Sequence, residues 1–383
     1  MLFSDVLGHE HIKKHLTTSA DRGRIAHAQI FSGRGVLPMA LAYTQYILCE
    51  TQSAETPERI ASCSAKFKKL AHPDVHFVYP VATNQKVKSK PTSDDFAQEW
   101  RESVLENPYL SLYDWYAALG IEKKQGQIGV DQAQEIVKKL SLKSYEGGYK
   151  VMLIWMAEKM NTASANKLLK LLEEPPEKTI FILMVEDEEQ LLSTITSRCQ
   201  LIKFPNLPEE AIAKGLVDRV NADYTVAKTA ARQATGDYNR ALQIYKNKSE
   251  DRHYEEWMIF WVRSAFRAKG NKTVIRDLLD WSEKLATKSR EEQKNFLDYA
   301  LNFFRQALLL NYKAPSLVYL NPYDTKFSLE KFAPFVHGGN IVDIVAALEE
   351  THYHIERNGN AKIIFTDLSI QLTRLLHKKA QSA

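Results

Sequence analysis

Short apolar runs alternate with helical patterns throughout residues 1–205, and this alternation limits the possible fold more than any other feature of the chain. Strands that alternate with helices are typical of an α/β domain with a parallel sheet. The apolar runs predict strands at Ala28–Ser32, Val75–Tyr79, Tyr149–Trp155, Thr179–Val185 and Leu201–Phe204. Periodic apolar positions predict helices between them, among them Met39–Cys49, Val130–Leu140 and Thr162–Leu172. For the last helix, Asn161 or Thr162 can cap the first turn.

Residues 81–127 interrupt this order. They begin with a basic stretch that contains Lys86, Lys88 and Lys90. A polar and aromatic segment follows, with Trp100, Tyr109, Tyr113 and Trp115. We interpret these residues as an insertion at the edge of the sheet, and their sequence predicts no function.

Two prolines, Pro205 and Pro208, mark the end of the core, because two prolines within four residues suit a connector. Residues 206–250 then predict a small helical lid, and residues 251–383 a wholly helical domain. Apolar residues in that domain recur at spacings of three and four, at Phe296, Ala300, Phe303, Ala307 and Leu310 and again at Ile364, Leu368, Leu372 and Leu375. Such wide apolar faces pack into a bundle or against other subunits.

Composition excludes some classes of protein. A hydrophobic fraction of 44% is normal for a globular chain with a core. No apolar run approaches the ~20 residues that cross a bilayer, and the N-terminus has no apolar signal segment. We therefore expect a cytoplasmic protein with no membrane partner. The net charge of +4 permits contact with nucleic acid but does not argue for it.

The turn after the first predicted strand has the position of a phosphate-binding loop but not its residues. A working loop of the form G-x-x-x-x-G-K-[ST] surrounds phosphates with backbone N–H groups and a lysine. Here Gly33 and Gly35 are followed by Val36 and Leu37, without a lysine, and Pro38 removes one N–H near the helix start. We interpret the segment as an ordinary strand-to-helix turn, that is, a degenerate loop.

The strand Tyr149–Trp155 ends in Trp155 and Met156, where an NTPase would place acidic residues. Magnesium prefers carboxylate oxygen, and neither side chain can supply it. We interpret this pair as a buried strand end. For Glu158, three residues beyond Trp155, a role at a helix start or on the surface is favoured over metal binding.

Arg198 lies between a core strand and the boundary prolines, in the segment Thr196-Ser197-Arg198-Cys199. A guanidinium can stabilise the charge of a phosphoryl group in its transition state, and a neighbouring subunit can supply it. The alternative is a surface arginine that pairs with a nearby acid such as Glu186 or Asp187.

The three cysteines, Cys49, Cys63 and Cys199, are widely spaced and predict neither a disulfide framework nor a four-thiolate zinc site. Cys49 and Cys63 with His72 do not have the short paired spacing of metal ligands. We expect no metal there, and His72-Pro73-Asp74 is expected to shape the entry to the second strand.

Several motifs in order resemble one family. They are Phe3-Ser4-Asp5-Val6-Leu7-Gly8, Ala26-His27-Ala28, His72-Pro73-Asp74, Tyr145–Val151, Ala165–Lys170, Leu172-Glu173-Glu174-Pro175-Pro176 and Thr194–Cys199. With them, residues 1–205 resemble subunits of the bacterial DNA polymerase III clamp loader, an AAA+ family, and are most similar to its delta-prime type. The C-terminal domain fits the collar of that family by its helical character only.

The resemblance implies a stator-like subunit that helps to load a sliding clamp on primer–template DNA during replication, within the polymerase holoenzyme. It implies gamma or tau and delta subunits as partners, and no cofactor bound in cis. Mg-ATP on a neighbouring subunit would face Arg198, an arginine finger acting in trans. Arg240, with Gly236, looks like a second-sensor region, and Cys63 like a remnant of a lost zinc site.

Two other functions stay open. The first is an active AAA+ ATPase motor subunit of the gamma or tau type with an unusual loop, and the chemistry of residues 33–38 speaks against it. The second is a DNA-binding module that uses Lys86–Lys90, for which binding would fall steeply with salt.

Overall fold

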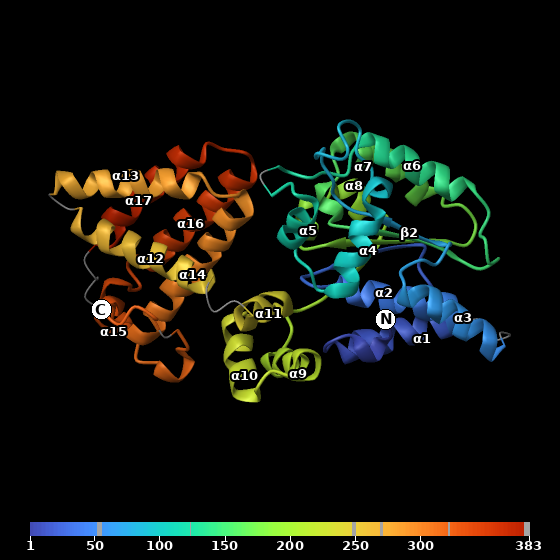
Figure 1. Cartoon of the computed structure of the whole chain (residues 1–383), viewed down its shortest axis with the longest axis horizontal. Coiled ribbons are helices and arrows are strands. Elements are labelled where there is room, and N and C mark those ends of the chain that lie inside the picture. The colour runs from blue at the N-terminus through green and yellow to red at the C-terminus, as the bar shows by residue number, and fades with distance from the viewer. Residues whose placement is uncertain (52–55, 123, 247–249, 269–270, 321, 379–383) are drawn as a thin grey trace. The chain divides into compact units, whose positions relative to one another are not determined.

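The computed structural model describes residues 1–51, 56–122, 124–246, 250–268, 271–320 and 322–378. It divides into two compact units, Met1–Leu242 and Gln243–Ala383 (Figure 1). The first unit holds the predicted core and most of the predicted lid. Residues 247–249 at the end of the predicted lid, residue 123 of the insertion and the C-terminal residues 379–383 lie outside the described part of the chain.

The first unit is built on a parallel sheet with strand order β2-β3-β4-β1-β5. The strands are β1 (Ala28–Ser32), β2 (Val75–Val78), β3 (Lys150–Trp155), β4 (Thr179–Val185) and β5 (Gln200–Lys203). Each predicted strand is therefore confirmed to within one residue at either end. The central strands β1, β3 and β4 are buried along their whole length, as expected for strands that are covered on both faces.

Helices cover the two faces of this sheet (Figure 1). On one face α2 (Leu37–Cys49) shares a core with Val151, Leu153 and Trp155 of β3, and α1 (Glu10–Asp21) and α3 (Pro57–Lys68) extend it. On the other face α6 (Val130–Ser141) and α7 (Thr162–Glu173) share a core with the alternate residues Met152 and Ile154. The alternation follows the two-residue period of a strand. As predicted, the side chain of Asn161 caps α7, accepting from the backbone N–H of Ser164.

The insertion follows the edge strand β2, and its two ends meet where Val81 bridges Gln127 in antiparallel fashion. Between them lie η2 (Ser93–Phe96), α4 (Ala97–Glu106) and α5 (Leu112–Leu119). Their aromatic residues form part of the core. The ring of Trp100 stacks on Tyr79, with centroids 4.2 Å apart, and contacts Trp115 at 5.2 Å. The insertion is thus folded onto the α2 face of the sheet.

The lid consists of α9 (Glu209–Val220), α10 (Tyr224–Gln233) and α11 (Tyr238–Lys246). Gly236 lies in the turn that separates α10 from α11, as the sequence predicts. Its φ is +95°, and a Cβ atom there would lie 2.5 Å from that of Asn206. The backbone N–H of Leu207 donates to the carbonyl of Gly236, which ties the connector to this turn.

The second unit is helical, as predicted. Its main helices are α12 (Glu250–Arg267), α13 (Lys272–Ala286), α14 (Arg290–Asn311), α16 (Ile341–Glu356) and α17 (Ala361–Leu375), with the short α15 (Leu329–Phe332). The predicted stripe of α14 faces its core, with Phe296, Phe303 and Ala307 all buried. The rings of Trp261 and Trp281 stack beside it at 4.9 Å.

A disulfide joins Cys49 at the end of α2 to Cys63 in α3, with the Cα atoms 5.7 Å apart. The prediction that the cysteines form no disulfide framework is therefore wrong for this pair. The two helices pack side by side, so cysteines that are 14 residues apart in the sequence meet at a distance that a disulfide can bridge. Cys199 is a free thiol, and burial raises its pKa to about 11.

Among the described helices, none combines the length and the apolar character that a membrane crossing needs.

Candidate functional site

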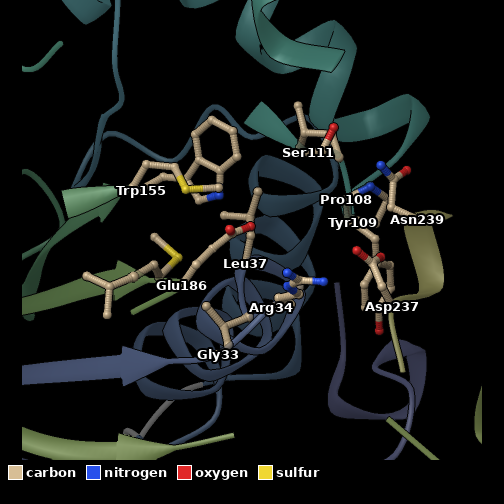
Figure 2. Close-up of a pocket in the computed structure, with 16 residues that line it drawn as sticks. Gly33, Arg34, Leu37, Pro108, Tyr109, Ser111, Trp155, Glu186, Asp237 and Asn239 are labelled. Atoms are coloured by element: carbon tan, nitrogen blue, oxygen red, sulfur yellow. The ribbon is translucent and has the colours of Figure 1, made fainter. Parts of the chain in front are cut away.

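A pocket lies at the carboxyl ends of β1, β3 and β4, where parallel sheets place their ligands. The loop Gly33–Leu37 after β1, the pair Trp155–Met156 after β3 and Met184–Glu186 at the end of β4 form one side of it. Pro108–Ser111 from the insertion and Asp237 with Asn239 from the lid form the rest. In Figure 2, Trp155 and the two lid residues lie on opposite sides, with Leu37 and Arg34 between them.

Backbone geometry accounts for both glycines of the predicted loop. Gly33 has φ +142°, and a Cβ atom there would lie 2.5 Å from the carbonyl oxygen of Phe204. Gly35 has φ +65°, and its Cβ atom would lie 3.1 Å from Cδ1 of Tyr109. The backbone N–H of Gly33 donates to the carbonyl of Val185 at 2.9 Å. The loop is therefore a tight strand-to-helix turn against neighbouring backbone, and it contributes no lysine.

The end of β3 is apolar. Trp155 is 4% exposed and Met156 6% exposed, and the indole of Trp155 contacts that of Trp100 with ring centroids 5.1 Å apart. Met156 adopts a left-handed conformation with φ +54°, which turns the chain into the short helix η3 (Ala157–Lys159). The strand thus ends in buried hydrocarbon and sulfur, which cannot act as hard-cation ligands.

Glu158 lies in the first turn of η3, so the predicted role at a helix start is confirmed, and its side chain is part-buried. One carboxylate oxygen accepts from the backbone N–H of Glu186 at 3.1 Å, and the other is buried without a hydrogen-bond partner. Burial raises the pKa of this carboxyl to about 7, against the smaller lowering effect of the backbone hydrogen bonds. Glu158 is not among the residues that line the pocket.

Little space remains in the pocket. The centres of water molecules can occupy about 30 Å³ of it, so the pocket has room for a few waters. The insertion reduces it, because Pro108–Ser111 lie against the loop Gly33–Leu37. Sequence reasoning missed this segment and the lid residues Asp237 and Asn239. The signal available was weak, a proline followed by the apolar residues Tyr109 and Leu110 in a segment with no regular pattern.

Arg198 lies outside this pocket, between α8 (Ser193–Thr196) and β5. Its guanidinium pairs with the carboxylate of Glu173, with Nη2 2.6 Å from Oε1, and Nη1 donates to the carbonyl of Thr194 at 2.8 Å. The alternative interpretation, a surface arginine paired with an acid, is thus confirmed, but the acid is Glu173 at the end of α7 and not Glu186 or Asp187. The Arg198 side chain is 36% exposed and that of Glu173 47% exposed, so the pair lies on the surface.

Two other candidates from the sequence, Arg240 and the basic stretch Lys86–Lys90, lie outside the pocket. Arg240 follows the pocket residue Asn239 on α11, and its backbone N–H donates to the Asp237 carboxylate at 3.1 Å, but it does not line the pocket. In the basic stretch of the insertion, Lys86 pairs with Glu99 at 2.7 Å and Lys90 with Asp131 at 4.0 Å.

His72 lies beside the disulfide. Ligand atoms of Cys63, His72 and Glu146 fall within 4.8 Å of one another, and Nε2 of His72 is 3.3 Å from the Glu146 carboxylate. A metal would need the thiolate of Cys63, which the disulfide removes. Asp74 accepts the backbone N–H groups of Tyr145 and Glu146 at 2.6 and 2.9 Å, so this motif shapes the entry to β2 as predicted.

Residues 8–208 match the protein family described as DNA polymerase III, delta subunit. The match covers more than half of the 383 residues and includes the pocket loop, the end of β3 and Arg198. The chain belongs to this family. The lid helices and the second unit lie beyond the matched residues.

Individual relatives support the assignment. The delta-prime subunit of DNA polymerase III from Bacillus subtilis is 29% identical over 239 residues, which are 62% of this chain and 59% of that protein. The delta-prime subunit from Escherichia coli is 35% identical over 131 residues, or 34% of this chain and 39% of that protein. The chain thus matches less than two thirds of the length of either relative.

More distant relatives match a longer part of the chain. The tau subunit of Bacillus subtilis is 22% identical over 398 residues, which are 99% of this chain and 62% of that protein. A solved gamma-subunit-related protein from Thermotoga maritima is 16% identical and covers 94% of this chain and 99% of its own, with a TM-score of 0.38. That score is too low to bear on fold or function.

Proposed function

We propose that this chain is a delta-prime-type subunit of a bacterial DNA polymerase III clamp loader, which helps to place a sliding clamp on primed DNA and does not hydrolyse ATP itself. The family match and the delta-prime relatives support this assignment. The cytoplasmic location expected from the sequence is part of the proposal.

The observation that carries the inactive state is the small pocket, whose loop after β1 and whose end of β3 lack the groups that hold a nucleotide. A hydrolytic site needs a lysine for the phosphates and a carboxylate for magnesium. The loop Gly33–Leu37 supplies no lysine, and Trp155 and Met156 supply no carboxylate. The space for a few waters is far smaller than a nucleotide requires. An active motor subunit, the alternative, would need a lysine in the loop, a carboxylate at the end of β3 and a larger pocket.

Arg198 is the residue that we assign to a neighbouring subunit's ATP. Its guanidinium is part-exposed on the surface and is held by the exposed Glu173, so an incoming phosphate can replace the carboxylate at little cost. Gamma or tau and delta subunits are the proposed partners, with Mg-ATP on the neighbour. The clamp and primer–template DNA would be reached through the complex.

A DNA-binding module is the less favoured function. Lys86 and Lys90 already have acidic partners, so the basic stretch presents less free positive charge than its sequence indicates. We expect the isolated chain to show no binding to DNA that falls steeply with salt.

Two measurements test the proposal together. The purified chain should neither bind a fluorescent ATP analogue nor release phosphate above a mock-purified control, whereas a gamma or tau subunit from the same host should do both. The tagged chain, purified from that host, should bring gamma or tau and delta with it. Turnover by the chain alone contradicts the inactive state. Purification without any clamp-loader subunit contradicts the assignment itself.

A further inference from the structure

Residues Asn107–Asp114 of the insertion, called here the pocket segment, pass from the end of α4 across the pocket to the start of α5. The side chain of Tyr109 lies against Gly35, where any Cβ atom would be 3.1 Å from its ring. The segment therefore occupies the space beside the loop that a phosphate-binding site would leave open.

Tyr109 connects three parts of the first unit. It is 4% exposed, and its hydroxyl accepts from the backbone N–H of Leu7 at 2.8 Å. Its ring packs on Tyr238 of the lid, with centroids 4.9 Å apart. The guanidinium of Arg219 from α9 lies over both rings, 5.1 Å and 5.3 Å from their centroids. Cation–π contacts of this kind are stronger where water is excluded.

Asn239 of α11 adds a polar link. Its amide nitrogen donates to the Asp114 carboxylate at 2.6 Å, and its amide oxygen accepts from the amide of Asn107 at 2.6 Å. Asn239 is 5% exposed, so losing either partner would leave a buried polar group unsatisfied. The same Asp114 oxygen accepts the backbone N–H of Ser111 at 2.8 Å, which fixes the start of α5.

We propose that the pocket segment is an internal ligand: it fills the pocket and holds the lid against the core in one orientation, without nucleotide. The contacts are made by a segment that is always present, so the lid position does not depend on ATP. This inference gives the insertion a function, and it rests on the proposed inactive state only in requiring that no nucleotide competes for the same space.

Hydrogen exchange measured by mass spectrometry on the full-length chain tests this proposal. Asn107→Ala changes the insertion, and Asn239→Ala changes the lid 132 residues away along the chain. Lys88→Ala, at an exposed position of the insertion, and Glu210→Gln, on the face of α9 that contacts Tyr224, are the matched controls. Each variant is measured with and without Mg-ATP.

Both asparagine variants should raise exchange together in residues 107–114 and in α9–α11, by roughly 10-fold or more, with β1, β3 and β4 unchanged. The controls should match the wild-type protein. If Asn107→Ala loosens only its own segment and leaves the lid protected, the internal-ligand proposal is wrong. If Mg-ATP changes lid exchange in the wild-type protein, the chain binds nucleotide and the proposed inactive state is wrong too. The variants without ATP thus test the internal-ligand proposal, and the wild-type protein with ATP tests the inactive state.

Discussion

At the scale of single residues, Glu158 gives the first unit a pH-dependent stability. Burial raises the pKa of its carboxyl from 4.5 to about 7 in the folded chain. Between these values the folded chain keeps a proton that the unfolded chain has released. Stability from this group is therefore present below pH 4.5 and is lost as the pH rises through 7.

We predict that Glu158→Gln removes this loss, because the amide oxygen can still accept from Glu186 and carries no charge. The variant should gain about 2–3 kcal/mol of unfolding free energy over the wild-type protein between pH 5 and pH 8, since each tenfold change in equilibrium is worth about 1.4 kcal/mol. Denaturant unfolding at several pH values measures the difference. Parallel profiles of the two proteins would show that Glu158 is not a buried acid.

Arg198 contributes little to the folding stability of its own subunit. Its ion pair with Glu173 is exposed on both sides, and exposed pairs are worth ~0–1 kcal/mol. We predict that Arg198→Ala lowers the unfolding free energy by less than about 1 kcal/mol, as measured in denaturant beside Lys203→Ala, another exposed cation with an acidic partner. A loss of several kcal/mol would make Arg198 a structural residue.

At the scale of elements, the disulfide between α2 and α3 closes a loop with a sequence separation of 14. Constraining a loop of this length restricts the unfolded chain, by about 3 kcal/mol in the chain-entropy account. We predict that a reductant lowers the unfolding free energy of the first unit by about 2–4 kcal/mol, and that Cys63→Ser abolishes the response.

The free thiol supplies the control for this prediction. Cys199→Ser should leave the effect of the reductant intact. Mass spectrometry of a non-reduced digest should find the Cys49 and Cys63 peptides linked. Alkylation of both thiols in the folded, non-reduced chain would contradict the disulfide.

The elements that the sequence predicted best are those whose pattern is local. The strands β1 and β4 match their predicted bounds residue for residue, because strands that helices cover on both faces of a sheet are rich in apolar residues. The turn at Gly33 and the apolar end of β3 could also be predicted, since each is determined by residues adjacent in the sequence.

Contacts between distant elements could not be predicted in this way. The acid that pairs with Arg198 comes from the end of α7, 25 residues earlier, and depends on how α7 and α8 pack. The link between Asn107 and Asn239 spans 132 residues. No periodicity in residues 107–114 indicates that they return to the pocket, because their contacts are side-chain contacts across the fold.

At the scale of the whole molecule, we assign the arginine finger to the first unit and the contacts with other subunits to the second. Wide apolar stripes in the helical unit suit a collar that joins subunits, and side chains such as Val342 and Ile363 remain exposed there, at 72% and 66%. We predict that residues 1–250 alone, which keep α11 whole, form a folded fragment that no longer assembles with gamma or tau and delta. Size-exclusion chromatography of mixed subunits measures this, and co-elution of the fragment at full stoichiometry would refute it.

ATP turnover by the reconstituted clamp loader, with Arg198→Ala in place of the wild-type chain, tests the central claim most directly. An arginine finger in trans can be worth ~10³ or more in rate at its site. Assembly should therefore be intact, clamp loading should fall more than total hydrolysis because other sites continue, and Arg198→Lys should rescue poorly since it lacks the guanidinium fork. Unchanged clamp loading by the alanine variant, at confirmed stoichiometry, would contradict the account.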